Sequence, residues 1–103
     1  MNREPSTLYA KLLGETAPII WQELQPFFAR GSLLWVDSEQ DLIEVAEAVA
    51  ENRQEVVAAW LEAGRIAVLS DSRAEDLLHR DPALWAVVVA PWVLVQERAE
   101  KKH

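Results

Sequence analysis

The chain has 103 residues, of which 50% are apolar and 26% are charged, and it contains five tryptophans and no cysteine. This composition predicts one globular domain over residues 1–103 and excludes disulfides, thiolate metal sites and cysteine nucleophiles. Seventeen acidic and ten scattered basic residues give a formal net charge of -7, which opposes binding to nucleic acid and to anionic lipid.

The first third of the chain is predicted to hold two helices. Residues 1–6 are polar and are expected to fray. Apolar residues at positions 8, 9, 12 and 13 share one face of a short helix that Gly14 ends. A second helix is predicted from Thr16 as its N-cap, with Pro18 in its first turn, to a break at Pro26.

The middle of the chain predicts a strand followed by helices. Residues 32–37 form a compact apolar run typical of a strand. Ser38, with Asp41 three residues later, resembles a capping box, and apolar residues from Leu42 to Val49 then recur at helical spacing. Asn52, with Glu55 three residues later, is predicted to be the N-cap of a fresh helix that Gly64 ends, and one long helix across Asn52 is the alternative.

The last third predicts two more strands around one helix. Residues 65–70 form a strand, Ser72 caps a short helix that Pro82 ends, and the apolar run over residues 84–96 forms the third strand before a tail expected to fray over residues 97–103. The order is α-α-β-α-α-β-α-β. The fold class is therefore α/β or α+β, with a small three-stranded sheet on which helices pack. Two helices between the first two strands permit a parallel pair, and the direction of the last strand stays open.

Acidic residues follow the first two predicted strands. In a parallel sheet, Asp37 and Asp71 would meet at the carboxyl edge, with Asp41 nearby, where they could bind a ligand or Mg²⁺. Helix capping explains the same Asp-Ser pairs. Because the chain has only two histidines and no phosphate-binding glycine motif, we expect no catalytic residues, no metal and no cofactor.

The final apolar run holds the clearest candidate for an interface. It is too short to span a bilayer, and it is apolar on both strand faces, with Trp85 and Trp92 on opposite faces if the strand is uninterrupted. Pro91 cannot donate a ladder hydrogen bond, so part of the strand is expected at an edge or bulge. An apolar edge invites pairing with a second chain. We therefore predict a homodimer with Trp85, Pro91, Trp92 and Leu94 at its interface.

Several motifs give the chain a family resemblance, at residues 21–24 (WQEL), 27–31 (FFARG), 41–46 (DLIEVA), 60–61 (WL) and above all 91–96 (PWVLVQ). The chain resembles a family of short bacterial proteins classed as domain of unknown function 2288, over nearly its whole length. The resemblance implies a bacterial cytoplasmic protein and transfers no site.

Together, these features favour a small non-enzymatic interaction or structural module that self-associates or binds a protein partner. The alternative is a small enzyme or metal-dependent ligand binder that uses the acidic residues at strand ends. The polar residues 1–7 do not form a signal peptide, which favours a cytoplasmic location.

Overall fold

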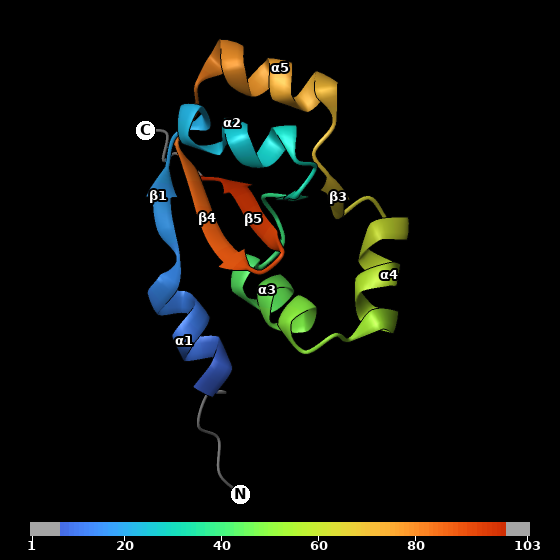
Figure 1. Cartoon of the computed structure of the whole chain (residues 1–103). Coiled ribbons are helices and arrows are strands. Elements are labelled where there is room, and N and C mark those ends of the chain that lie inside the picture. Colours follow the sequence, from blue (N-terminus) through green and yellow to red (C-terminus); the bar gives the residue numbers. More distant parts are fainter. Residues whose placement is uncertain (1–6, 99–103) are drawn as a thin grey trace, which may run out of the picture.

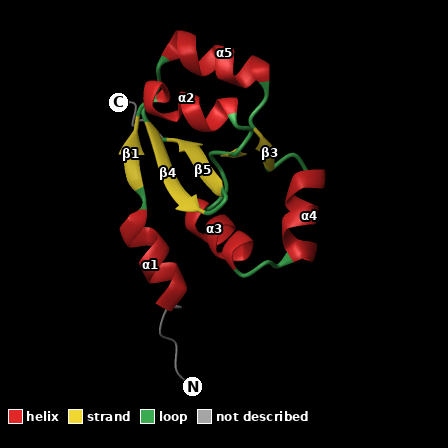
Figure 2. Ribbon diagram, in the orientation of Figure 1, coloured by secondary structure: helices red, strands yellow, loops and turns green. Residues whose placement is uncertain are grey.

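The structure, a computed structural model, describes residues 7–98 and contains five helices and five strands in this range (Figure 1, Figure 2). In chain order they are α1 (Thr7–Glu15), β1 (Ala17–Ile19), α2 (Trp21–Ala29), β2 (Leu33–Val36), α3 (Leu42–Ala50), α4 (Gln54–Glu62), β3 (Ile66–Val68), α5 (Asp71–Arg80), β4 (Leu84–Val89) and β5 (Trp92–Glu97).

The five strands form one mixed sheet in the order β1-β4-β5-β2-β3. β2 and β5 are parallel, and the other neighbouring pairs are antiparallel. The mixed α and β class predicted from the sequence is correct, but the predicted count of three strands is too low. The C-terminal strand β5 lies at the centre of the sheet, with a partner along each side.

One of the two missed strands is β1, where a helix start was predicted. Thr16 does not cap a following helix, because its hydroxyl donates to the carbonyl of Leu12 in the last turn of α1 at 2.8 Å. The next three residues instead pair with β4, with Pro18 opposite Trp85. A proline is tolerated there because β1 is an edge strand. The following helix starts at Trp21 and continues through Pro26, which does not end it.

The other missed strand comes from the final apolar run, which folds as a hairpin rather than as one long strand. Val89 pairs with Trp92, so Ala90 and Pro91 form the two-residue turn, and the bond between them is cis. Pro91 therefore lies outside the ladder, at neither an edge nor a bulge. Because the chain reverses, Trp85 and Trp92 point to the same face of the sheet and pack against the same apolar cluster.

The predicted frayed ends are only partly covered by the structure. Residues 1–6 and 99–103 lie outside the described residues. Glu97 belongs to β5, and the backbone N–H of Arg98 donates to the carbonyl of Ala83 at 2.9 Å. The ladder thus extends beyond the predicted strand end at residue 96.

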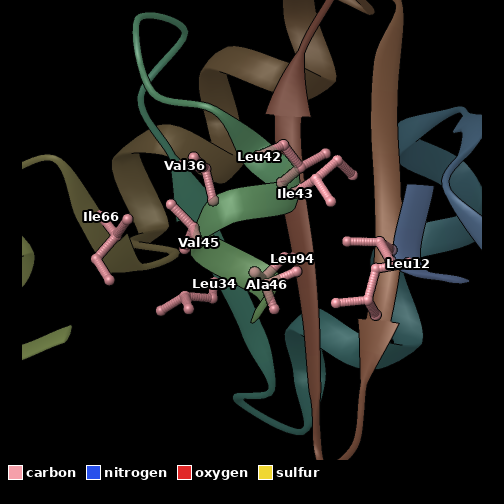
Figure 3. Close-up of a cluster of buried hydrophobic side chains, with 10 residues drawn as sticks. Leu12, Leu34, Val36, Leu42, Ile43, Val45, Ala46, Ile66 and Leu94 are labelled. Carbon is pink, nitrogen blue, oxygen red and sulfur yellow. The ribbon is translucent and has the colours of Figure 1, made fainter. Parts of the chain in front are cut away.

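Helices cover both faces of the sheet, giving three layers (Figure 1). α2 and α5 lie on one face over a core that includes Leu24, Leu77 and Val95. α1, α3 and α4 lie on the other, where side chains of α3 meet those of β2 and β5 around Val45 and Leu94 (Figure 3). This arrangement explains why the hairpin strands are apolar on both faces, since each face is covered within the chain.

Two helix starts differ from their predicted positions by two or three residues. The N-cap of α3 is Asp41, not Ser38, and the N-cap of α5 is Ser70, not Ser72. The predicted break between α3 and α4 is correct. The backbone at Asn52 has φ of 57°, in the left-handed region that Asn tolerates better than most residues, so no single long helix forms.

Candidate functional site

The three acidic residues of the predicted strand-end site do not converge. β2 and β3 are antiparallel, which contradicts the parallel pairing on which that site depended. The N–H of Asp37, after the end of β2, donates to the carbonyl of Arg65, which precedes the start of β3. Asp71 begins α5, beyond the other end of β3. The two connecting helices were predicted correctly, but they return the chain to the end of the sheet where β2 stops, so β3 runs antiparallel to β2.

Each of these aspartates has a local structural role instead. Asp37 accepts the N–H of Glu39 at 2.9 Å, which closes a turn. One carboxylate oxygen of Asp41 accepts the N–H groups of Ile43 at 2.9 Å and Glu44 at 3.3 Å, and the other accepts the hydroxyl of Tyr9 at 2.9 Å. This last hydrogen bond raises the pKa of the Tyr9 phenol.

Within residues 7–98, no group of three or more Asp, Glu or His side chains is placed to hold a metal ion. In the same range, no helix has the length and apolar character needed to cross a membrane.

The predicted interface residues lie along the β4–β5 hairpin, but only part of the set reaches the surface. Leu94 has no exposed area, and the backbone on both sides of β5 is already paired, so Leu94 cannot contact a partner. Trp85 is half-buried and lies near the open end of the hairpin, where the guanidinium of Arg98 stacks 4.6 Å from its ring centre. Pro91 is exposed and Trp92 is half-buried, and both lie at the turn.

A groove of about 440 Å³ lies beside this turn, between the hairpin, α4 and the edge strand β3. Leu61 and Val68 line it and are 46% and 50% exposed, although both are large apolar residues. No side chain of α4 is fully buried, and the helix packs against the core through the partly buried Val57 and Trp60. We call the apolar part of this groove the turn surface, and it consists of Val57, Leu61, Val68, Pro91 and Trp92.

The turn has a second hollow on the opposite face of the sheet, with a volume of about 480 Å³. Pro91 and Trp92 line this hollow as well, together with Phe27 and Val88. Val88 is 60% exposed, more than any other large apolar residue in the described part of the chain. The guanidinium of Arg30 lies 4.8 Å from the ring centre of Phe27 at the edge of this hollow. The hairpin turn is thus flanked by uncovered apolar surface on both faces.

A separate cavity of about 400 Å³ lies at the open end of the same hairpin, where the parallel strands β2 and β5 end and α3 begins. Trp85, Gln96, Asp41 and Ile43 are among its lining residues. Gln96 is 9% exposed, and its side-chain nitrogen donates to the carbonyls of Asp37 at 2.8 Å and Gln40 at 2.6 Å.

Gln96 had no part in the site predicted from the sequence. The signal available was an amide side chain at the end of an otherwise apolar run. That position is polar for a reason that appears only once β5 lies beside β2: the side chain must satisfy two carbonyls of the β2–α3 connection.

Comparison with known proteins agrees with the fold and with the resemblance seen in the motifs. The chain is similar to a protein of Pseudomonas aeruginosa described as "NMR solution structure of PA1075", with 63% identity, coverage of 100% of this chain and 95% of that chain, and a TM-score of 0.82. No curated protein matches the chain. The family model described as "Protein of unknown function (DUF2288)" matches residues 7–97, which is most of the sequence. The chain therefore belongs to this family, as its motifs indicated.

Proposed function

We propose that this protein is a non-enzymatic interaction module that self-associates through the turn surface, with Trp92 as its anchor. The observation that carries the proposal is a groove in which apolar residues of three elements lie side by side. These elements are α4, which has no fully buried side chain, the edge strand β3 and the hairpin turn. Monomeric proteins rarely leave apolar residues gathered in this way without a partner. Aromatic side chains near the centre of such a surface commonly dominate the binding energy.

A second copy of the chain is the partner that this surface fits best. β3 is an edge strand, and Leu69 and Arg65 on either side of it make the hydrogen bonds to the β2 strand region. Since bonded pairs alternate along an antiparallel ladder, the backbone groups of Ile66 and Val68 point away from β2. A two-fold axis beside β3 would therefore bring together apolar side chains and unused backbone groups of two identical chains.

The charges around the groove agree with pairing between identical surfaces. Arg53 lies in the groove lining and forms an ion pair with Glu51 at 2.7 Å, so the rim carries both signs of charge. An interface between two identical surfaces is favoured by both signs of charge, because the positive groups of each copy can then face the negative groups of the other. Among the described residues, the rim has no patch of one charge sign that would attract a strongly acidic or strongly basic partner.

The proposed self-association uses a different surface from the one predicted from the sequence. The predicted route was pairing along the C-terminal strand, but β5 has no free side. The proposed contact uses side chains at the hairpin turn and the edge of β3 instead. The rival function, an acidic ligand or metal site, needed Asp37, Asp41 and Asp71 together, and the antiparallel β2 and β3 place Asp71 at the opposite end from the other two. The cytoplasmic location stays a prediction.

The test is the mass of the purified protein in solution, measured by light scattering at increasing micromolar concentration. We expect the wild type to reach twice the mass of one chain, and Leu61→Lys and Trp92→Glu to shift the transition to higher concentration. Leu61→Lys carries most weight, since Leu61 is exposed and its replacement leaves the core unchanged.

Leu78→Lys is the matched control, because Leu78 is 57% exposed on α5, in the layer across the sheet. Its mass should follow that of the wild type. Circular dichroism establishes that each variant is folded. A wild type that stays monomeric at every concentration, or a Leu78→Lys variant that dissociates as Leu61→Lys does, would show that the turn surface is not the interface.

A further inference from the structure

The cavity at the open end of the hairpin contains a hydrogen-bond acceptor that the fold does not use. The side-chain nitrogen of Gln96 has two donor hydrogens, and both are directed to backbone carbonyls, at 2.8 Å to Asp37 and 2.6 Å to Gln40. Carbonyl oxygens only accept, so they determine which branch of the amide faces them. The amide oxygen of Gln96 therefore occupies the other branch.

This amide oxygen has no hydrogen-bond partner among the described residues. It also retains access to its surroundings, because no fully buried side-chain oxygen or nitrogen in the described chain lacks a partner. Gln96 as a whole is only 9% exposed, and it lines the cavity. Because Gln96 lines this cavity, we take the cavity as the route by which a ligand reaches the acceptor. The structural role of Gln96 explains its nitrogen and leaves its oxygen without a function.

The remaining walls restrict the chemistry of a ligand. Trp85, Leu42 and Ile43 supply apolar surface, and the Asp41 carboxylate supplies a second group that only accepts hydrogen bonds. A ligand that covers the Gln96 oxygen removes it from water, and an acceptor buried without a donor is costly, so a ligand that fits must carry an N–H or O–H donor. The volume of about 400 Å³ is within the usual range for small-molecule sites.

The cavity lies at a place in the fold where proteins with parallel strands commonly bind ligands. The carboxyl ends of adjacent parallel strands open onto the N-terminus of a following helix, and this is where sheets with parallel strands commonly bind ligands. β2 and β5 are the parallel pair in the described sheet, and α3 begins beside their ends. Two arginines also lie close to these residues: Arg65 donates to the side chain of Gln40, and Arg98 stacks on Trp85. These two positive charges balance the two carboxylates of Asp37 and Asp41, so a neutral ligand is favoured over a charged one.

We propose that this cavity binds a small, uncharged, largely apolar molecule that carries an N–H or O–H donor, with the amide oxygen of Gln96 as its acceptor. This proposal does not rest on self-association, because the cavity and the turn surface lie at opposite ends of the hairpin. A variant that is monomeric through Leu61→Lys should bind the molecule as well as the wild type does.

Indole is a suitable probe, and N-methylindole is its matched control, since it has nearly the same shape without the donor. In NMR titrations of ¹⁵N-labelled protein, we expect indole to cause saturable shifts of the side-chain N–H signals of Gln96 and Trp85. N-methylindole should bind at least about tenfold more weakly, because it leaves the acceptor unpaired.

Leu13→Trp tests the location without disturbing the core, because Leu13 lines the cavity and is 56% exposed. The larger side chain should cover the opening and abolish the shifts. Leu78→Trp, at an equally exposed leucine on the opposite layer, should leave binding unchanged. Equal affinity for the two indoles, shifts centred on the turn surface, shifts that persist in Leu13→Trp, or no saturable shifts at all would each overturn the proposal.

Discussion

Replacement of Asp41 by alanine should destabilise the fold more than any other single change in the β2–α3 connection. One carboxylate oxygen accepts two N–H groups in the first turn of α3, from Ile43 at 2.9 Å and from Glu44 at 3.3 Å. The other oxygen accepts the Tyr9 hydroxyl and so joins α1 to α3. Loss of an N-cap aspartate costs about 1 kcal/mol, within a range of about 0.5 to 2 kcal/mol.

The Tyr9 hydrogen bond adds a smaller amount, because the hydroxyl is exposed and water can replace the carboxylate. We therefore expect Asp41→Ala to lower the free energy of unfolding by about 1 to 2 kcal/mol, which corresponds to several degrees in Tm for a domain of this size. Asp41→Asn should cost less than half as much, since asparagine caps helices about as well as aspartate does.

Urea denaturation followed by tryptophan fluorescence measures these differences. Ser38→Ala is the control, because Ser38 is exposed and makes no side-chain hydrogen bond in the structure, and its effect should stay below about 0.5 kcal/mol. Equal losses in Asp41→Ala and Ser38→Ala, or a larger loss in Ser38→Ala, would refute the assignment of Asp41 as the cap.

Three further outcomes can be measured in the same denaturation assay. Ser70→Ala should cost about 1 kcal/mol, because its hydroxyl accepts an N–H group in the first turn of α5. Leu77→Ala should cost about 2 to 5 kcal/mol and Leu78→Ala below about 0.5 kcal/mol, since the first is fully buried and its neighbour is 57% exposed. Hydrogen bonds from Arg80 lower the pKa of Asp76, so the stabilisation by this pair is present above the ordinary carboxylate pKa and is lost as the pH falls through the lowered value. The stability difference between Asp76→Asn and the wild type should therefore shrink as the pH is lowered from about 7 to about 2.

The parts of the fold that the sequence predicts well are those that local spacing determines. Apolar residues at helical spacing mark α3 and α4, and Asn52 marked the break between them, although the N-cap of α4 is Arg53 and not Asn52. The compact runs that became β2 and β3 were also recognised. In each case the residues that determine the element lie within the element itself.

β1 was missed because nothing within it marks a strand. It has three residues, one of them Pro18, and its pairing with β4 joins positions almost 70 apart, as in Ala17 with Ala86. The same Thr16 and Pro18 are favourable at a helix start, so local rules predict the wrong element. Residues 17–19 form a strand rather than a helix start because β4 lies beside them as a pairing partner.

The acidic site failed for a topological reason rather than a chemical one. The expectation required β2 and β3 to be parallel, and a connection as long as the two predicted helices permits parallel pairing. In the structure α3 and α4 return the chain to the end where β2 stops, so β3 runs the other way, and the parallel partner of β2 is β5. The strand-end edge that ligands commonly occupy therefore does exist in this protein, and Asp41 lies beside it. Gln96 and not Asp71 lies there with Asp41, which could not be known before the partner of β2 was known.

The hairpin connects the two proposals, and its geometry shows how they can be separated experimentally. A long strand would place Trp85 and Trp92 on opposite faces, but the turn at Ala90 and Pro91 brings both to the face covered by α1, α3 and α4. Both tryptophans pack against one apolar cluster, Trp92 beside the turn surface and Trp85 beside the cavity at the other end of the strands. A disruptive change at either tryptophan can disturb the packing that holds the other, so loss of both properties in Trp92→Glu would report only on the shared core. Leu61 and Leu13 are exposed and belong to one surface each, and for this reason substitutions at these leucines distinguish self-association from ligand binding.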